Sequence, residues 1–212
     1  MTTQSPRFLP SLLLLTVTLY NLRTTAAAVR SSAAANPDAA TFIRTSCRRT
    51  LYPDLCVSSL SSFTNTIQNN HAMLARAAIT VSLSRAQSMA SYVSNLLRQA
   101  NKNADSGTAS ALRDCSYSLG VAVDNIRGSF KQMQQMTDKS AVNGEKFRFQ
   151  MSSVQTWMST AMTEEQACSE RFDASPDGRV KTDVRRQVTE VKKFISNALA
   201  LVQGYGNNVR KH

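Results

Sequence analysis

Apolar and small residues recur every three or four positions along most of the chain beyond residue 70. This spacing places them on one face of a helix, and it predicts four long amphipathic helices. The stripes are Ile79, Leu83, Ala86, Ala90, Val93 and Leu97; Leu112, Cys115, Leu119, Ala122, Ile126, Met133 and Met136; Phe147, Met151, Val154, Met158, Ala161 and Cys168; and Val184, Val188, Val191, Ile195, Ala198, Val202 and Tyr205. No segment alternates apolar and polar residues long enough to predict a sheet.

Turn and cap residues mark where these helices are expected to begin and end. The first helix is expected from Asn70 to Ala100. The signals for the others are Ser106 as N-cap of the second, the Asn143-Gly144 break before the third, and, around the fourth, Ser175-Pro176-Asp177-Gly178 and the closing Gly204 and Gly206. Because the connections are short, we predict an all-α fold, an antiparallel up-down-up-down four-helix bundle.

Two cysteines fit this bundle as a pair. If the second and third helices form a hairpin that turns near Ala141, Cys115 and Cys168 lie almost equally far from the turn and reach the same level. Antiparallel packing therefore predicts a Cys115–Cys168 disulfide.

The other two cysteines, Cys47 and Cys56, flank Leu51-Tyr52-Pro53 almost symmetrically. The residue before a proline disfavours helix, so a turn is expected there. We predict a short N-terminal helical hairpin with a Cys47–Cys56 disulfide across its base. Metal ligation is the alternative, but no C-x-x-C occurs, and His71 and His212 lie far from every cysteine.

Residues 1–28 are typical of a secretory signal peptide. Arg7 precedes the apolar run that begins with Leu12–Leu15, and the small residues 26–28 suit a cleavage site. A membrane anchor is the alternative, but the run is shorter than the roughly 20 apolar residues that cross a bilayer. The expected organisation is a signal peptide over 1–28, a linker over 29–37, a folded domain over 38–206 and a basic polar tail over 207–212. We expect the mature chain to be exported and soluble, and disulfides persist in the oxidising compartments that exported proteins reach.

The chain is basic, with 25 Lys and Arg against 14 Asp and Glu, a formal net charge of +11. Loss of Arg7 and Arg23 with the signal peptide lowers this charge by two. The excess favours an anionic neighbour. Nucleic acid is disfavoured, because export separates the two and no aromatic residues interleave with the basic ones. The basic pairs that could meet a polyanion are Arg48-Arg49, Arg185-Arg186, Lys192-Lys193 and Arg210-Lys211.

The sequence contains no motif for catalysis. H-E-x-x-H, G-x-S-x-G and a glycine-rich phosphate loop are all absent. The carboxylates of Glu164-Glu165, and of Asp173 with Asp177, are expected to be solvated surface groups, and His71 and His212 are not expected to be catalytic. The methionines at helical spacing are expected in the core, namely Met133, Met136, Met151, Met158 and Met162. We therefore expect neither enzymatic activity nor a cofactor.

Several motifs in order carry a family resemblance. They are Phe42-Ile43-Arg44-Thr45-Ser46-Cys47; Thr50-Leu51-Tyr52-Pro53-Asp54-Leu55-Cys56; Leu112-Arg113-Asp114-Cys115 with Ala122-Val123-Asp124-Asn125-Ile126; Val154-Gln155-Thr156-Trp157-Met158-Ser159-Thr160-Ala161-Met162-Thr163 before Cys168; and Ser196-Asn197-Ala198-Leu199-Ala200-Leu201. Over about residues 38–206 the chain resembles the plant invertase/pectin methylesterase inhibitor family. The resemblance implies a four-helix bundle with an N-terminal hairpin, disulfides paired first with second and third with fourth, and a proteinaceous inhibitor without catalysis.

Within that family, Gln155-Thr156-Trp157 and the basic character resemble the pectin methylesterase inhibitors, and the Pro-Lys-Phe tripeptide linked to invertase binding is absent. The resemblance implies a secreted inhibitor in the apoplast or cell wall. It is expected to be a monomer that forms a 1:1 complex with pectin methylesterase and covers that enzyme's pectin-binding cleft. Weak binding to anionic pectin is also expected, and membrane association after signal removal is not. The alternatives are an inhibitor of cell-wall or vacuolar acid invertase, or a pectin-binding wall protein without inhibitory activity.

The chain departs from the family pattern at four positions near the third and fourth cysteines. Tyr117, Ala167 and Glu170 stand where many members have Glu, Thr and Asp, and Val121 replaces an acid. Of these, only Glu170 keeps the acidic character. A lost hydrogen-bonding or charged contact at the centre of an interface can cost about 2 kcal/mol or more. The remaining residues expected to contact the enzyme are Asp124, Gln155, Thr156, Thr160, Thr163 and Glu170.

Overall fold

The structure is a computed structural model that describes residues 37–103, 105–137 and 144–209. The expected signal peptide, the linker as far as residue 36, the turn near Ala141 and His212 lie outside the described residues. Among the described helices, none combines the length and the apolar character that a membrane span requires.

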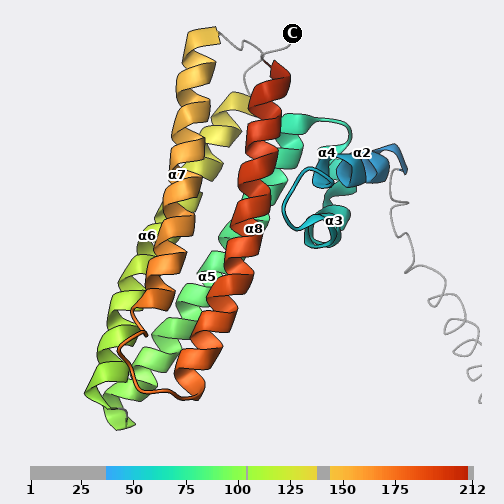
Figure 1. The fold of residues 1–212 in the computed structure, drawn as a ribbon. Coiled ribbons are helices and arrows are strands. Elements are labelled where there is room, and N and C mark those ends of the chain that lie inside the picture. Colours follow the sequence, from blue (N-terminus) through green and yellow to red (C-terminus); the bar gives the residue numbers. More distant parts are fainter. Residues whose placement is uncertain (1–36, 104, 138–143, 210–212) are drawn as a thin grey trace, which may run out of the picture. The chain divides into compact units, whose positions relative to one another are not determined.

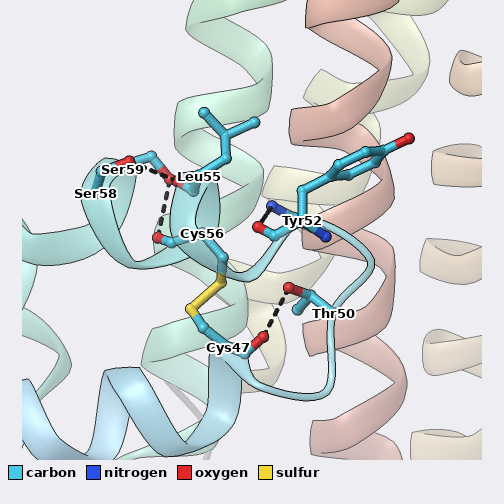
Figure 2. Close-up of a disulfide and its surroundings, with 8 residues drawn as sticks. Cys47, Thr50, Tyr52, Leu55, Cys56, Ser58 and Ser59 are labelled. Carbon is cyan, nitrogen blue, oxygen red and sulfur yellow. Dashed lines mark hydrogen bonds between the residues drawn. A yellow bond between two sulfur atoms is a disulfide. The ribbon is translucent and has the colours of Figure 1, made fainter.

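The N-terminal part of the described chain is a hairpin of short helices. It contains α2 (Pro37–Cys47), α3 (Pro53–Leu60), the 3-10 helix η2 (Ser61–Phe63) and α4 (Thr64–Ile67). Pro53 occupies the first turn of α3, where its missing N–H leaves no helical hydrogen bond unmade. The Cys47–Cys56 disulfide joins the end of α2 to the first turn of α3, and the Thr50 hydroxyl donates to the Cys47 carbonyl at 2.8 Å (Figure 2).

Four long helices form the rest of the described chain. They are α5 (His71–Asn103), α6 (Ser106–Thr137), α7 (Gly144–Glu170) and α8 (Arg179–Val209). Helix α5 packs against α6 and α8, and α7 packs against the same two helices. The colours of Figure 1 show that successive long helices run in opposite directions. The prediction of an all-α bundle is confirmed, and the described residues contain no strand.

Nearly all predicted stripe residues are buried. Every one on α6, α7 and α8 lies in the core, together with the Cys115–Cys168 disulfide, the pairing that turn symmetry predicts. The predicted buried stripe of α5 is partly wrong, because Leu83, Ala90 and Leu97 are only half-buried. Met89 is buried in α5 instead. It lies between Ala86 and Val93 at helical spacing, so the three residues share one face of the helix.

Two predicted helix boundaries are wrong. The N-cap of α6 is Asp105 rather than Ser106, since its carboxylate accepts the Thr108 N–H at 2.8 Å. Gly204 and Gly206 lie inside α8, which continues to Val209. Gly206 serves packing, because a Cβ at this position would lie 3.2 Å from Met151 Cε of α7.

Candidate functional site

Two contacts set the register between α6 and α7. The Cys115–Cys168 disulfide brings the two Cα atoms to 4.0 Å, and the Trp157 ring lies over Gly128 of α6, 3.5 Å from where a Cβ would stand. Because residue numbers rise along one helix as they fall along the other, Asp124 lies at about the level of Thr160. The motif residues of both helices therefore occupy one stretch of the bundle.

Four predicted contact residues line one open, polar groove on α7. The groove is lined by Gln155, Thr156, Ser159, Thr160, Thr163 and Gln203. The five α7 residues follow a spacing of three and four, which is one face of a helix, and Gln203 adds an amide from α8. Ser159 was missed although the same spacing places it in the stripe. Gln203 carries no local signal, because only the packing of α8 against α7 brings it there.

The other two predicted contact residues do not line this groove. Asp124 is exposed on α6 and forms an ion pair with Arg127 one turn further along. Glu170 is the last residue of α7 and accepts a hydrogen bond from the Gln166 amide at 2.8 Å. Gln166 in turn accepts from the Lys192 ammonium of α8 at 2.5 Å. Glu170 thus belongs to a polar network that reaches from α7 to α8.

An exposed aromatic residue lies on α6 at the level of this network. Tyr117 is 75% exposed, and it precedes Val121 by one turn and Asp124 by two, so that the three share one face of α6. Tyrosine is enriched at protein interfaces because its ring buries apolar area while its hydroxyl forms a hydrogen bond. The sequence identified Tyr117 only as a lost carboxylate, whereas the structure shows it as a large exposed contact group.

Glu165 is not the solvated surface group that the sequence predicted. Its side chain is fully buried on the core face of α7, and neither carboxyl oxygen has a hydrogen-bond partner among the described residues. Burial raises the pKa of Glu165 to about 8, although the Lys192 ammonium acts in the opposite direction. Helical spacing from Ala161 and Cys168 could have revealed this position, but glutamate is rarely buried without a partner.

The other acidic pair lies at the surface, as predicted. Asp173 forms an ion pair with Arg185 of α8. Asp177 lies 3.0 Å from the Lys181 ammonium, which holds the pKa of the Asp177 carboxyl below its ordinary value. These ion pairs fasten the connection between α7 and α8 to the first turns of α8.

The groove formed by α7 and Gln203 of α8 offers groups that bind rather than react. It carries hydroxyls and amides, which donate and accept hydrogen bonds. All four cysteines are in disulfides, and the described residues include no group of three or more His, Cys, Asp or Glu placed to hold a metal ion. Such a face suits recognition of another macromolecule.

Comparisons with known proteins identify one matching family and several similar proteins. Residues 41–201 match the family described as plant invertase/pectin methylesterase inhibitor. Pectinesterase inhibitor 9 of Arabidopsis thaliana is 39% identical over 166 residues, which are 77% of this chain and 80% of that protein. The 21 kDa protein of Daucus carota is 38% identical over 179 residues, 84% of this chain and 88% of that protein.

A solved structure supports the fold. The mutant form A of a pectin methylesterase inhibitor from Arabidopsis superposes with a TM-score of 0.58 at 16% identity, covering 76% of this chain and 95% of that one. At this identity the likeness concerns the helical fold alone.

Proposed function

The chain belongs to the plant invertase/pectin methylesterase inhibitor family, and from that membership we propose that it inhibits pectin methylesterase by forming a 1:1 complex with it. The family consists of inhibitor proteins, so the chain is an inhibitor and not an enzyme. The observation that carries the proposal is the family match over residues 41–201, together with relatives named pectinesterase inhibitors that are 36 to 39% identical.

We place the enzyme contact on the groove formed by α7 and Gln203 of α8, together with the exposed α6 residues Tyr117 and Asp124. Hydroxyl and amide groups of the groove would bond to polar groups at the rim of the enzyme's pectin-binding cleft, and Tyr117 would bury its ring. The sequence-predicted contacts Asp124 and Glu170 lie outside the groove and would act at the edge of this interface.

We propose secretion to the apoplast or cell wall, with residues 1–28 removed as a signal peptide and residues 38–206 as the inhibitor domain. The short apolar run followed by small residues supports this proposal. N-terminal sequencing of the protein recovered from plant cell-wall fluid would test it. A mature chain that still begins at Met1 would contradict it.

Titration of two enzymes tests the inhibitor function. Purified, oxidised protein lacking residues 1–28 is added in rising amounts to a plant pectin methylesterase and, separately, to an acid invertase. We expect the methylesterase activity to fall to a plateau at a 1:1 molar ratio and the invertase activity to remain unchanged. Inhibition of invertase alone, or of neither enzyme, would overturn the proposal.

A further inference from the structure

A second hollow lies where the N-terminal hairpin meets the bundle. Its walls come from the end of α2 and the connection to α3, the first turn of α5 and the last turns of α8, and its volume is about 820 Å³. A volume of this size accommodates a small-molecule or short-oligomer ligand. This hairpin pocket and the groove on α7 share one lining residue, Gln203 of α8.

The hairpin pocket is cationic. Arg49 lines it, His71 faces the same space, and no Asp or Glu is among its lining residues. On α8, by contrast, Arg185, Arg186 and Lys193 each form an ion pair with a nearby carboxylate, and Lys192 donates to the Gln166 side chain. Burial, and then the positive charge of Arg49, hold the pKa of His71 below its ordinary value.

The polar part of the remaining lining suits a molecule with many hydroxyl groups, and Leu74, Ala200 and Leu201 form an apolar part. Thr45, Ser46, Gln203 and Asn208 each carry a group that both donates and accepts hydrogen bonds. Phe42 and His71 add an aromatic wall, with their ring centroids 4.8 Å apart in an edge-to-face arrangement. A sugar ring is complementary to this lining, because its hydroxyls can form hydrogen bonds and its C–H faces can pack against aromatic rings.

The backbone around Arg49 is held in place before any ligand arrives. The Thr50 N–H donates to the Cys47 carbonyl at 3.0 Å, and the Thr50 hydroxyl donates to the same oxygen (Figure 2). The Cys47–Cys56 disulfide closes the connection, and the buried Asn197 amide of α8 binds the Tyr52 N–H and carbonyl at 3.1 and 2.9 Å. A preorganised segment loses less conformational entropy on binding.

We propose that the hairpin pocket binds a short oligosaccharide of uronic acids, with the Arg49 guanidinium paired to a sugar carboxylate. Guanidinium and carboxylate groups match in charge and in planar, two-bond geometry. The anionic-sugar chemistry comes from the pocket lining, whereas the choice of galacturonate among uronic acids rests on the proposed function. An inhibitor of pectin demethylesterification would then hold the de-esterified product of that reaction at a site next to its proposed enzyme contact.

Calorimetric titration of the purified protein without any enzyme tests the proposal. The ligands are trigalacturonate, its trimethyl ester and tri-glutamate, and the variants are Arg49→Gln and Arg48→Gln. Arg48 is the matched control, because it is an exposed neighbour of the same charge that does not line the pocket. We expect trigalacturonate to bind, Arg49→Gln to weaken binding at least tenfold and Arg48→Gln to weaken it less than twofold. The ester and the peptide are expected to bind at least tenfold more weakly than trigalacturonate.

Nuclear magnetic resonance of the His71 imidazole gives an independent readout, because its ring signals are expected to shift on saturation with trigalacturonate. Circular dichroism confirms that each variant is folded. Equal losses in the two arginine variants, or equal binding of tri-glutamate, would show diffuse charge attraction and overturn the proposal, as would no binding of trigalacturonate at millimolar concentration. Because no enzyme is present, these outcomes are independent of whether the protein inhibits pectin methylesterase.

Discussion

Glu165 places a carboxyl group among the apolar side chains of α7. The charged group that acts on it is the Lys192 ammonium of α8. Its folded-state pKa of about 8 lies above the ordinary value of 4.5, so the folded protein retains a proton that the unfolded chain releases between these two pH values. Stability therefore falls as pH rises through this window, by up to about 1.4 kcal/mol per pH unit.

The first prediction is that Glu165→Gln flattens this pH dependence. A glutamine cannot ionise, so the variant is expected to lose little stability between pH 5 and pH 8, while the parent protein becomes markedly less stable. Urea unfolding at a series of pH values measures the difference. Glu164→Gln, which changes the half-buried neighbour, serves as the control and is expected to retain the parent slope. An unchanged slope in Glu165→Gln would contradict the assignment.

At the residue scale, sequence indicated the threonine stripe of α7 but not its full surroundings. Thr156, Thr160 and Thr163 follow a local spacing that any helix preserves, so their common face was predictable. Glu165 follows the same periodicity, but its residue type favours water, and only the packed bundle shows that this helix face is buried.

At the scale of elements, Asn197 links the hairpin to the bundle. Its amide accepts from the Tyr52 N–H and donates to the Tyr52 carbonyl, so one α8 side chain satisfies both polar groups of a residue between α2 and α3. The Lys193 ammonium lies 5.8 Å from the centre of the Tyr52 ring and adds a cation–π contact. The Ser196–Leu201 motif thus includes a structural clamp.

The second prediction is that Asn197→Ala destabilises the protein by about 1 to 2 kcal/mol, because it leaves the Tyr52 N–H without its partner, while the Tyr52 carbonyl keeps its bond from the Cys56 N–H. Chemical unfolding measures the loss, and hydrogen exchange is expected to rise first in α2 and α3. Ser196→Ala is the control on the same turn and is expected to change stability by less than about 0.5 kcal/mol. Unchanged exchange in the hairpin of Asn197→Ala would show that the clamp is dispensable.

The third prediction compares the two disulfides. In the chain-entropy account, the Cys115–Cys168 bond, with a sequence separation of 53, stabilises the fold by roughly 4 kcal/mol. The Cys47–Cys56 bond, with a separation of 9, contributes roughly 2.5 kcal/mol. Replacing each pair with alanine and measuring urea unfolding tests this order. A larger loss from the hairpin pair would show that local strain or unfolded-state structure outweighs loop length.

The order of the helices was largely predictable because apolar spacing and turn residues are local signals. The ends of the helices were less predictable. Gly204 and Gly206 resemble a stop, yet α8 continues through both; at Gly206 the absence of a side chain makes room for Met151, whereas Gly204 is exposed with no neighbour near its Cβ position. Whether a glycine ends a helix or admits a neighbouring helix depends on contacts that the sequence does not display.

At the scale of the whole molecule, the α7 groove and the hairpin pocket meet at Gln203 and are otherwise lined by different residues. The fourth prediction is that Thr160→Arg, which puts a long cation into the α7 groove, weakens inhibition of pectin methylesterase at least tenfold without lowering stability by more than about 1 kcal/mol. Enzyme titration and thermal unfolding measure the two effects.

Thr189→Arg is the control for that variant, because it adds the same group to an exposed position on α8 outside the groove. It is expected to inhibit like the parent protein. Equal inhibition by Thr160→Arg and Thr189→Arg would remove the groove from the enzyme contact and leave the α6 surface around Tyr117 as the remaining candidate.

Neither disulfide links the N-terminal hairpin to the four-helix bundle. One closes within residues 47–56 and the other within residues 115–168, and neither spans the connection at residues 68–70 between α4 and α5. A single proteolytic cut at Asn69 or Asn70, both exposed, would leave two polypeptides with no covalent bond between them. The hairpin would then dissociate under denaturing, non-reducing conditions, and in the native state only contacts such as the Asn197 clamp would retain it.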